Sequence, residues 1–414
     1  MKSKILIIGA GISGLTAAYY LYKSGHEVQI IEASDSSGGR IKTDFFNGFL
    51  LDHGFQVFLT EYSEAKKILN YDTLNLKPFL PGAIVLHDGG TFEIADPFRR
   101  PSALFPTIFA PVGSLLDKWK TFTLKNHLVS QSFSKLFSQS EKTTLQRLED
   151  YGFSKKMIRL FYQPFFSGIF LENNLKTSNR MFDFVLKCFS QGNAVIPENG
   201  MHEIPKQIAS HLPKNTILFN KRIEKIENGI AYDQNNTEYK ADKIIIATEA
   251  TSLLANYKKD ANQKFQSVTN IYFETDIAPS KKPIVILNAS TNKKWVNNLV
   301  VMNAVSNKYA PKGKHLISVS YNGIPSISEQ DLAKNMQEEV AAWFPEAITN
   351  WKFLKAYTIK YALPNQNQVR NDLQESDFKI SDNLFVCGDH LLNGSINGAM
   401  KSGRILAEYI SKIV

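Results

Sequence analysis

Three glycines near the N-terminus have the spacing of a phosphate-binding turn, in the string Gly9-Ala10-Gly11-Ile12-Ser13-Gly14. In a GxGxxG turn the first glycine permits a tight bend, the second lets a pyrophosphate approach the backbone, and the third lets a helix pack closely on a strand. The free amide N–H groups and the dipole of the following helix then favour a doubly charged group. The spacing therefore predicts a dinucleotide site that uses Gly9, Gly11, Ile12, Ser13 and Gly14.

A carboxylate stands where such a site needs one. Glu32, followed by Ala33, ends the next apolar run. A carboxylate there can accept hydrogen bonds from both hydroxyl groups of an adenosine ribose, and it would repel a 2′-phosphate. The other interpretation is a glycine-containing turn followed by a surface glutamate. These residues alone do not decide between NAD and FAD.

The flanking residues predict the elements that would hold this turn. Residues 4–8 form an apolar run of the buried parallel-strand type, 12–24 have helical spacing, and 28–31 form a second buried strand. Together they predict a βαβ unit. The unit also accounts for the uncharged stretch from Ile5 to Tyr22. A membrane span or signal segment would leave its glycines unexplained, so that interpretation is rejected.

Further glycine-containing strings occur at both ends of the chain and in its middle. They are Ser37-Gly38-Gly39-Arg40, Leu51-Asp52-His53-Gly54-Phe55-Gln56, Pro197-Glu198-Asn199-Gly200-Met201, Cys387-Gly388-Asp389, Ser395-Ile396-Asn397-Gly398-Ala399 and Ser402-Gly403. With these motifs in this order, the chain resembles the flavin-dependent amine oxidase superfamily, which includes protoporphyrinogen oxidases and phytoene-type carotenoid desaturases. The resemblance covers the whole chain, and it implies that the dinucleotide is FAD.

The resemblance also implies roles for residues in these motifs. Arg40, after Gly39, would lie by the FAD phosphates. Asp389, after Gly388, would hold the ribityl chain or, through water, the pyrophosphate, and Ile223 would contact the adenine. The segment that would pass the isoalloxazine ring consists of Gly54, Phe55, Gln56 and Val57.

The last predicted helix would contribute to the same site. It begins near Ile396, includes Asn397 and Ala399, and runs to Ile413. By the resemblance, its N-terminal amides would face the flavin pyrimidine oxygen. Negative charge builds there as the flavin is reduced, so the helix dipole would favour reduction.

The pattern of elements predicts an α/β fold in two parts. A discontinuous Rossmann-like FAD-binding domain would comprise residues 1–78, 191–258 and 375–414, and a second α+β substrate domain would comprise 79–190 and 259–374. In the second domain the sequence predicts a hairpin over 84–94 and an antiparallel or mixed sheet from strands between 265 and 321. It also predicts a helix over 145–161 that closes at Pro164 and another over 181–189.

Composition limits the partners. The 414 residues carry a formal charge of +9, but Lys and Arg are scattered, which predicts a solvated surface and no nucleic-acid partner. The cysteines, Cys188 and Cys387, are far apart and form no CxxC pair. This excludes a zinc site or disulfide framework, fits a cytoplasmic location, and favours non-covalent FAD.

No acid–base dyad is found in the sequence. His53, His202 and His390 lie near motifs, but each is interpreted as structural, and no catalytic residue or metal ligand is assigned. A flavoenzyme needs none, because FAD performs the difficult step. Two alternatives from other classes are an NAD-dependent dehydrogenase, which would have no use for the C-terminal motifs, and a flavin-binding protein without turnover.

The substrate prediction depends on aromatic residues. By the resemblance, amine oxidases frame the amine with paired aromatics near the C-terminal flavin motif, and none follows Asp389. The string from Phe161 to Phe170, with Pro164 and Gly168, looks more like protoporphyrinogen oxidases and desaturases. A large apolar substrate is therefore predicted, with an amine as the alternative. The electron acceptor and the oligomeric state are not predicted.

Residues 99–120 are rich in apolar side chains and basic flanks. Phe105, Ile108, Phe109, Val112, Leu115 and Trp119 are accompanied by Arg99, Arg100, Lys118 and Lys120. Pro101, Pro106 and Pro111 exclude a regular spanning helix. The preferred interpretation is a roof over the substrate cavity inside the protein. The alternative is peripheral contact with the inner membrane face, from which an apolar substrate could enter.

Overall fold

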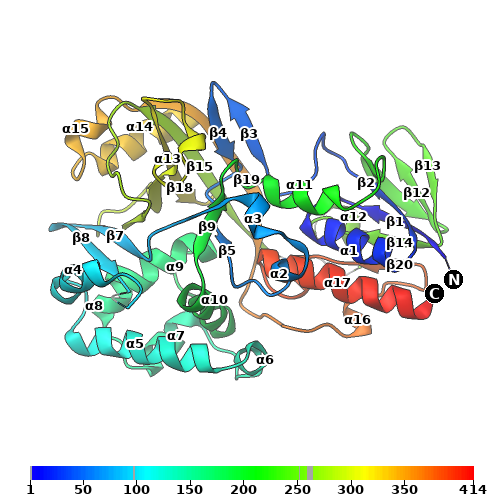
Figure 1. Cartoon of the computed structure of the whole chain (residues 1–414), viewed down its shortest axis with the longest axis horizontal. Coiled ribbons are helices and arrows are strands. Elements are labelled where there is room, and N and C mark those ends of the chain that lie inside the picture. The colour runs from blue at the N-terminus through cyan, green and yellow to red at the C-terminus, as the bar shows by residue number, and fades with distance from the viewer. Residues whose placement is uncertain (1, 97, 251, 259–263) are drawn as a thin grey trace.

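The computed structural model describes residues 2–96, 98–250, 252–258 and 264–414, and it contains two main sheets (Figure 1). The first is a five-stranded sheet in which every pair of neighbours is parallel. Its order is β10 (Ile217–Leu218), β2 (Glu27–Ile31), β1 (Lys4–Ile8), β14 (Lys243–Ile246), β20 (Leu384–Val386). The predicted strand–turn–helix–strand unit is the β1-α1-β2 part of this sheet, with α1 at Ile12–Lys23.

The central strands of this sheet are apolar because both of their faces are covered. Residues Ile5 to Ile8 of β1 are all buried, which is typical of a parallel sheet between helices. Helix α17 (Ile396–Ile413) lies alongside α1 (Figure 1). A Cβ atom at Gly403 would lie 2.3 Å from the carbonyl oxygen of Ser13, so this glycine permits the close approach of the two helices.

The second sheet has seven strands and is mixed, as the sequence predicts. Only β16 and β7 are parallel, and the other neighbours are antiparallel. Its order is β19 (Lys352–Pro364), β15 (Phe265–Thr275), β18 (His315–Asn322), β17 (Asn298–Val301), β16 (Val285–Asn288), β7 (Gly82–His87), β8 (Gly90–Ala95). The predicted hairpin over 84–94 is the β7–β8 pair.

Smaller strand groups and helices complete the half that holds the parallel sheet. The strands are β3 (Thr43–Phe46), β4 (Phe49–Asp52), β5 (Phe58–Leu59), β6 (Leu76–Pro78), β9 (Ala194–Pro197), β11 (Ile223–Glu227), β12 (Ile230–Asp233) and β13 (Glu238–Lys240). The helices are α2 (Ala65–Ile68), α3 (Tyr71–Leu74), α11 (Glu203–Ser210), α12 (Ser252–Ala255), α16 (Glu375–Phe378) and the 3₁₀ turn η5 (Asp389–Leu391).

Most helices of the other half form one layer below the mixed sheet in Figure 1. That layer contains η1 (Pro101–Ala103), α4 (Leu104–Phe109), α5 (Leu115–Ser130), α6 (Phe133–Phe137), α7 (Thr144–Asp150), α8 (Lys155–Met157), η2 (Ile158–Tyr162), α9 (Gln163–Phe170) and α10 (Asn179–Gln191). On the other side lie α13 (Met302–Val305), η4 (Asn307–Tyr309), α14 (Glu329–Val340) and α15 (Pro345–Ile348).

The prediction that a helix closes at Pro164 is wrong. Helical backbone continues from α8 through η2, a π-helical turn, into α9, and Pro164 is the second residue of α9. The π turn rearranges the hydrogen bonds just before the proline. Its missing N–H therefore falls at the start of a new α-helical segment, where it is tolerated.

The two sheets divide the chain as the predicted pieces do. All strands of the parallel sheet come from 1–78, 191–258 and 375–414, and all strands of the mixed sheet come from 79–190 and 259–374. The exact domain limits stay a prediction, and the one at 258–259 adjoins residues outside the described part of the chain.

Candidate cofactor and substrate site

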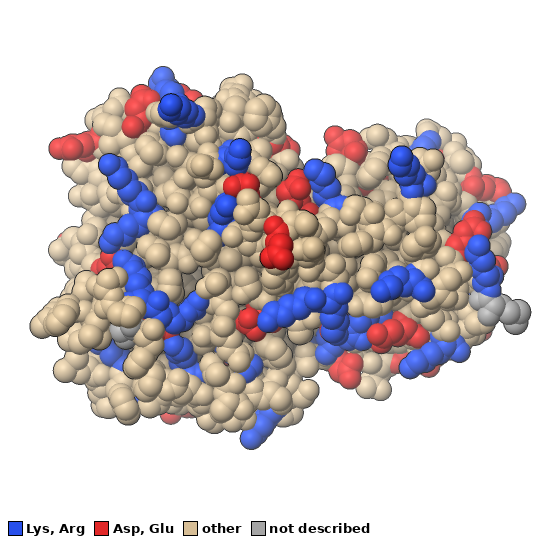
Figure 2. Space-filling model, viewed as in Figure 1, with Lys and Arg blue, Asp and Glu red and all other residues tan. Residues whose placement is uncertain are grey.

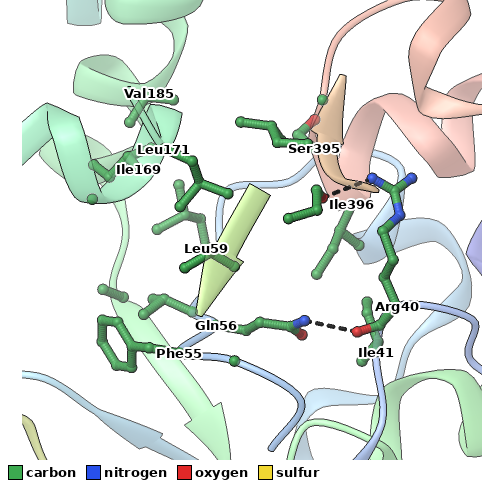
Figure 3. Close-up of a pocket in the computed structure, with 18 of the residues that line it drawn as sticks. Arg40, Ile41, Phe55, Gln56, Leu59, Ile169, Leu171, Val185, Ser395 and Ile396 are labelled. Atoms are coloured by element: carbon green, nitrogen blue, oxygen red, sulfur yellow. Dashed lines mark hydrogen bonds between the residues drawn. The ribbon is translucent and has the colours of Figure 1, made fainter. Parts of the chain in front are cut away.

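A single cavity of about 1110 Å³ extends from the GxGxxG turn to the helical layer of the other half. All of the predicted cofactor residues line it except Gly14 and Asn397. Figure 3 shows part of this cavity, with Phe55, Leu59, Ile169, Leu171 and Val185 on one side and Arg40, Ile41, Ser395 and Ile396 on the other. The cavity exceeds the range of about 300–1,000 Å³ that is usual for one drug-sized ligand, so it has room for a dinucleotide and part of a second molecule.

The three glycines of the turn differ in what they permit. Gly9 has a positive φ of +107°, which suits glycine. A Cβ at Gly14 would lie 2.1 Å from the carbonyl oxygen of Gly9, so Gly14 allows the helix to pack on the turn, outside the cavity. Gly11 has an ordinary φ of −72°, and a Cβ there would meet nothing within 4 Å. Neither backbone nor packing requires this glycine, but an empty space at the N-terminus of α1 is what a pyrophosphate needs.

At the nucleotide end of the cavity, Glu32 accepts hydrogen bonds from two neighbouring loops. This buried carboxylate accepts hydrogen bonds from the Ala10 N–H at 2.7 Å, the Ser34 N–H at 2.8 Å and the Ser34 hydroxyl at 2.6 Å. Carboxylate oxygens accept more than one bond each, so Glu32 keeps capacity for a ribose hydroxyl. Ala33 and Ile223 line the same end. The sequence did not predict that Glu32 also fixes the turn itself.

Arg40 joins the N-terminal and C-terminal motifs. Its Nη2 lies 2.6 Å from Oδ1 of Asp389, and its Nη1 donates to the carbonyl oxygen of Ala362 at 3.0 Å. Burial disfavours the charge of the guanidinium, but the attraction of Asp389 outweighs it and raises the pKa of Arg40 above its usual value. The pair places a fixed cation on the cavity wall, where anionic phosphates would be neutralised.

The segment from Gly54 to Val57 forms another wall. Gly54 has a φ of +89°, and Nε2 of Gln56 donates to the carbonyl oxygens of Arg40 at 2.8 Å and His53 at 3.3 Å (Figure 3). Its Oε1 is buried and has no hydrogen-bond partner among the described residues. A ligand N–H group could use this acceptor, and the flavin ring carries one.

The N-terminus of α17 opens towards the cavity through Ile396 and Ala399. Ser395 caps the helix, because its hydroxyl accepts from the Gly398 N–H at 2.9 Å. The Asn397 side chain points away from the cavity, and a cofactor role for this residue stays a prediction. Its Oδ1 accepts from the Glu64 N–H at 3.0 Å, so it ties the helix to residues 63–64 and does not line the cavity.

The structure reveals a histidine–carboxylate pair that the sequence analysis missed. Nε2 of His53, a cavity-lining residue, lies 2.9 Å from Oδ1 of Asp44. Oδ2 of Asp44 accepts from Nζ of Lys355 and from the hydroxyl of Tyr357, each at 2.7 Å. Burial works against the charge of Asp44, but these donors lower its pKa well below the usual range. Pairing of β3 with β4 and the approach of β19 create the cluster, so only knowledge of the hairpin register could have indicated it.

The two cysteines lie outside the cavity. Burial raises the pKa of both Cys188 and Cys387 to about 12, so both thiols are protonated and unreactive near neutral pH. Both observations agree with non-covalent FAD. Within the described ranges, no cluster of three His, Cys, Asp or Glu side chains is placed to hold a metal ion.

Eight apolar side chains between residues 98 and 119 are exposed at the rim of the cavity. The apolar rim, as we call it, consists of Phe98, Leu104, Phe105, Ile108, Phe109, Leu115, Leu116 and Trp119. Phe105, Phe109 and Trp119 are 70%, 78% and 61% exposed, and Leu104, Ile108 and Leu115 also line the cavity. The interpretation as an internal roof therefore holds for Ile108 and Leu115, which line the cavity, and is wrong for the exposed Phe105, Phe109 and Trp119. The short α4 and the start of α5 lie at the cavity's outer edge, and Val112 beneath them is buried.

A parallel sheet with a GxGxxG turn, a buried carboxylate after the second strand and a cavity that reaches the other half are typical of proteins that bind a dinucleotide. The family model of the flavin-containing amine oxidoreductases matches residues 12–411. The chain belongs to this family, which confirms the resemblance and the fold class. It is an FAD-dependent oxidoreductase.

Comparison with solved structures gives the same fold. A putative protoporphyrinogen oxidase from Exiguobacterium sp. 255-15 is 14% identical with a TM-score of 0.74, over 100% of both chains. An oxidoreductase from Methanosarcina mazei is 18% identical with a TM-score of 0.72, over 98% of this chain and 100% of that one. A putrescine oxidase bound to putrescine is 14% identical with a TM-score of 0.67, over 99% of both. At these identities the likeness shows the fold alone.

The matches to curated sequences are local. Forty residues are 55% identical to an L-amino acid oxidase of Bothrops pictus, which is 10% of this chain and 8% of that protein. Sixty-seven residues are 42% identical to a protein of Drosophila melanogaster named possible lysine-specific histone demethylase 1, which is 16% of this chain and 8% of that protein. The matched segments thus cover under a tenth of these relatives' length.

Proposed function

We propose that this enzyme dehydrogenates a large, mostly apolar molecule. The observation that carries the proposal is the lining of the cavity beyond the predicted flavin position. The side chains there are apolar and largely aromatic: Phe79, Phe161, Phe165, Phe189, Ile169, Leu171 and Val185. Bound FAD would supply the oxidising power by accepting hydride at flavin N5. The protein's part is to orient the substrate C–H bond and to exclude water.

The carboxylates of the cavity argue against a cationic amine. Burying a cation is costly unless a carboxylate pairs with it. Of the acidic residues that line the cavity, Asp96 is paired with Lys125 and Asp389 with Arg40. Glu32 and Glu249 lie at the nucleotide end, the latter two residues beyond Ala247, which packs against Gly9. The aromatic part of the cavity thus offers no unpaired carboxylate among the described residues.

The test is anaerobic reduction of the bound flavin. The holoenzyme is mixed with polyenes and tetrapyrroles, or with a matched set of primary and secondary amines, and bleaching of the flavin absorbance is followed. We expect bleaching by members of the apolar set only. Bleaching by amines alone would replace this proposal with an amine oxidase. Bleaching by neither set, with flavin still reducible by dithionite, would favour a flavin-binding protein without turnover.

We also propose that the apolar rim rests on the surface of a membrane, on the cytoplasmic face. A large apolar substrate partitions into a bilayer, and the rim surrounds the cavity that would receive it. Exposed Phe, Leu and Trp side chains in short helices are suited to the interface between headgroups and acyl chains. Within the described residues, no helix has both the length and the apolar character needed to cross a membrane, so the contact would be peripheral.

Charge supports the choice of an anionic lipid surface. Residues 98–140 contain six basic residues and one acidic residue, Asp117. Arg100 and Lys125 are paired with Glu93 and Asp96, which leaves Arg99, Lys118, Lys120 and Lys135. Asp117 is buried, where it accepts from Ser114 and Ser154. In the space-filling view the left edge of the molecule, where α4 lies, is largely tan with blue side chains beside it (Figure 2). An apolar patch with basic neighbours matches an anionic bilayer.

A further inference from the structure

The floor of the substrate part of the cavity is one face of the mixed sheet. Leu287 in β16 pairs with Asn298 in β17, which pairs with Ser320 in β18. Directly paired residues of neighbouring antiparallel strands point to the same face, and all three line the cavity. Val285 and Val268 line it as well. In strands β15 to β18 the floor is therefore apolar except at Asn298 and Ser320.

The Asn298 amide is half satisfied. Its Oδ1 accepts a hydrogen bond from the Ser320 hydroxyl at 2.9 Å, and the hydrogen bonds of the described residues leave its Nδ2 without an acceptor. In the next strand, Asn270 pairs with Ser320 in register. Its Oδ1 accepts from the Ser318 hydroxyl at 3.1 Å, and its Nδ2 is buried without a partner. Two amide donors in this row of paired residues, separated by Ser320 of β18, thus have no acceptor, which is unusual because buried polar groups are generally paired.

Helix α9 leaves room for the Asn298 amide. A Cβ at Gly168, which also lines the cavity, would lie 2.4 Å from Nδ2 of Asn298. Glycine inside a helix is unfavourable, and here the space it leaves is taken by this amide. The adjacent Asn297 is held by Nζ of Lys293 at 2.6 Å and the Ser167 hydroxyl at 2.8 Å. The start of β17 is therefore fixed against α9, and Asn298 is held in place at the cavity.

A charged side chain lies nearby, because Lys293 binds the adjacent Asn297, but Lys293 does not line the cavity. In the part of the chain that the structure describes, no ion pair or hydrogen bond brings a charged side chain to Asn298 or Ser320. A buried carboxylate of a substrate would need a cation to compensate its charge. A neutral oxygen, such as that of a ketone, ester or alcohol, needs only a donor.

We infer that Asn298, positioned by Ser320, is a recognition site for a neutral oxygen atom on the substrate. This inference rests on the proposed function and narrows it. The substrate is an apolar molecule with one oxygen-bearing end, which the amide donor binds, while the aromatic walls hold the remainder. A pure hydrocarbon would leave the donor unpaired, and a site with an unpaired buried donor discriminates against such a ligand.

The test compares two ligands of equal shape. 2-Acetylnaphthalene carries a carbonyl oxygen where 2-isopropenylnaphthalene carries a CH₂ group. Dissociation constants of both for the holoenzyme are measured by equilibrium dialysis, for the parent and for Asn298→Leu. Any effect of the substitution that changes both dissociation constants by the same factor cancels in their ratio. We expect the substitution to shift this ratio by about 3- to 10-fold against the ketone, as for one lost neutral hydrogen bond.

The control is Leu287→Val, a neighbour on the same floor without a polar group. It should change both dissociation constants alike and leave their ratio unaltered. Asn298→Ala is measured as well, with FAD content as the check that each variant is folded. A ratio that stays within twofold of the parent in both Asn298 variants overturns the inference and leaves the proposed function standing. A parent that binds neither ligand overturns the apolar substrate and the inference with it.

Discussion

At Gly11, the absence of a side chain is needed for the predicted cofactor but not for folding. A side chain at this position would meet nothing within 4 Å, so we expect Gly11→Val to fold and yet to be purified with little FAD, because the valine occupies the predicted pyrophosphate space. The measurements are FAD content per chain and the melting temperature of the apoprotein. Gly14→Val is the matched control. Its Cβ would lie 2.1 Å from the Gly9 carbonyl oxygen, so it should lower the melting temperature of the apoprotein itself. A yellow Gly11→Val protein with full FAD content would show that the dinucleotide lies elsewhere.

His390 makes stability depend on pH. Burial lowers its pKa to about 4, and its Nε2 has no hydrogen-bond partner among the described residues. In the unfolded chain the imidazole titrates near 6.5, so between about pH 6.5 and 4 the unfolded state binds the extra proton. The stabilising contribution is therefore complete above about pH 6.5 and is lost as the pH falls towards 4.

Urea unfolding at several pH values checks this expectation. The free energy of unfolding should fall with decreasing pH in this window, by at most about 3 kcal/mol from this residue. His390→Leu should flatten that part of the profile and leave the value at pH 8 nearly unchanged. If the free energy of unfolding falls equally steeply with decreasing pH in parent and variant, another group causes the loss of stability in acid.

At the scale of elements, the contact between α1 and α17 joins the two ends of the chain at the cofactor site. Gly403→Leu would press a side chain against the Ser13 carbonyl oxygen, which lies 2.3 Å from the position of a Cβ. We expect a loss of about 1–3 kcal/mol in the free energy of unfolding, as for overpacked cores, together with weaker FAD binding, because the N-terminus of α17 shifts. Glu408→Ala on the exposed side of the same helix removes an ion pair to Arg404 and should cost well under 1 kcal/mol. Denaturant titration of both variants distinguishes the contact from general damage to the helix.

Elements with a repeating or family-specific pattern could be predicted from the sequence. The strands and helix of the first βαβ unit and the hairpin over 84–94 depend on local patterns of apolar and glycine residues. Other features depend on tertiary contacts. The π turn that admits Pro164, the thirteen-residue strand β19 and the exposure of α4 are set by what packs around them, which local patterns do not record.

In the candidate site too, some residues could be predicted from motifs and others depend on tertiary contacts. Residues in motifs, such as Gly11 and Arg40, were found because each motif has a fixed place along the chain, and they line the cavity as expected. Asn397 belongs to a motif, but its side chain turns to Glu64. The His53–Asp44 pair and the Asn298 amide belong to no motif. They arise from strand pairing in β3–β4 and in the mixed sheet, and register between distant strands is not readable from one sequence.

At the scale of the whole molecule, the two ends of the cavity have different surroundings. The nucleotide end lies at the carboxyl edge of the parallel sheet, where ligands of open α/β folds bind. The other end opens between helices that expose Phe105, Phe109 and Trp119. A contiguous apolar patch of this kind on a soluble surface marks an interaction site. Its position at the cavity mouth favours a source of substrate as the partner, which for an apolar substrate is the bilayer.

Co-sedimentation with liposomes tests this arrangement. With vesicles containing anionic phospholipid, we expect the protein to pellet at low ionic strength and less so as salt screens the basic residues. Phe105→Asp combined with Phe109→Asp should reduce binding strongly, because both side chains would carry charge into the interface. Phe45→Asp is the matched control, since Phe45 is 76% exposed but lies on β3, at the far side of the mixed sheet from α4 (Figure 1). It should bind as the parent does.

A parent that stays in the supernatant at low salt, or a double variant that pellets as well as the parent, would exclude the rim as a membrane contact. If size-exclusion chromatography instead shows that the parent is a dimer and the double variant a monomer, the rim contacts a second copy of the chain.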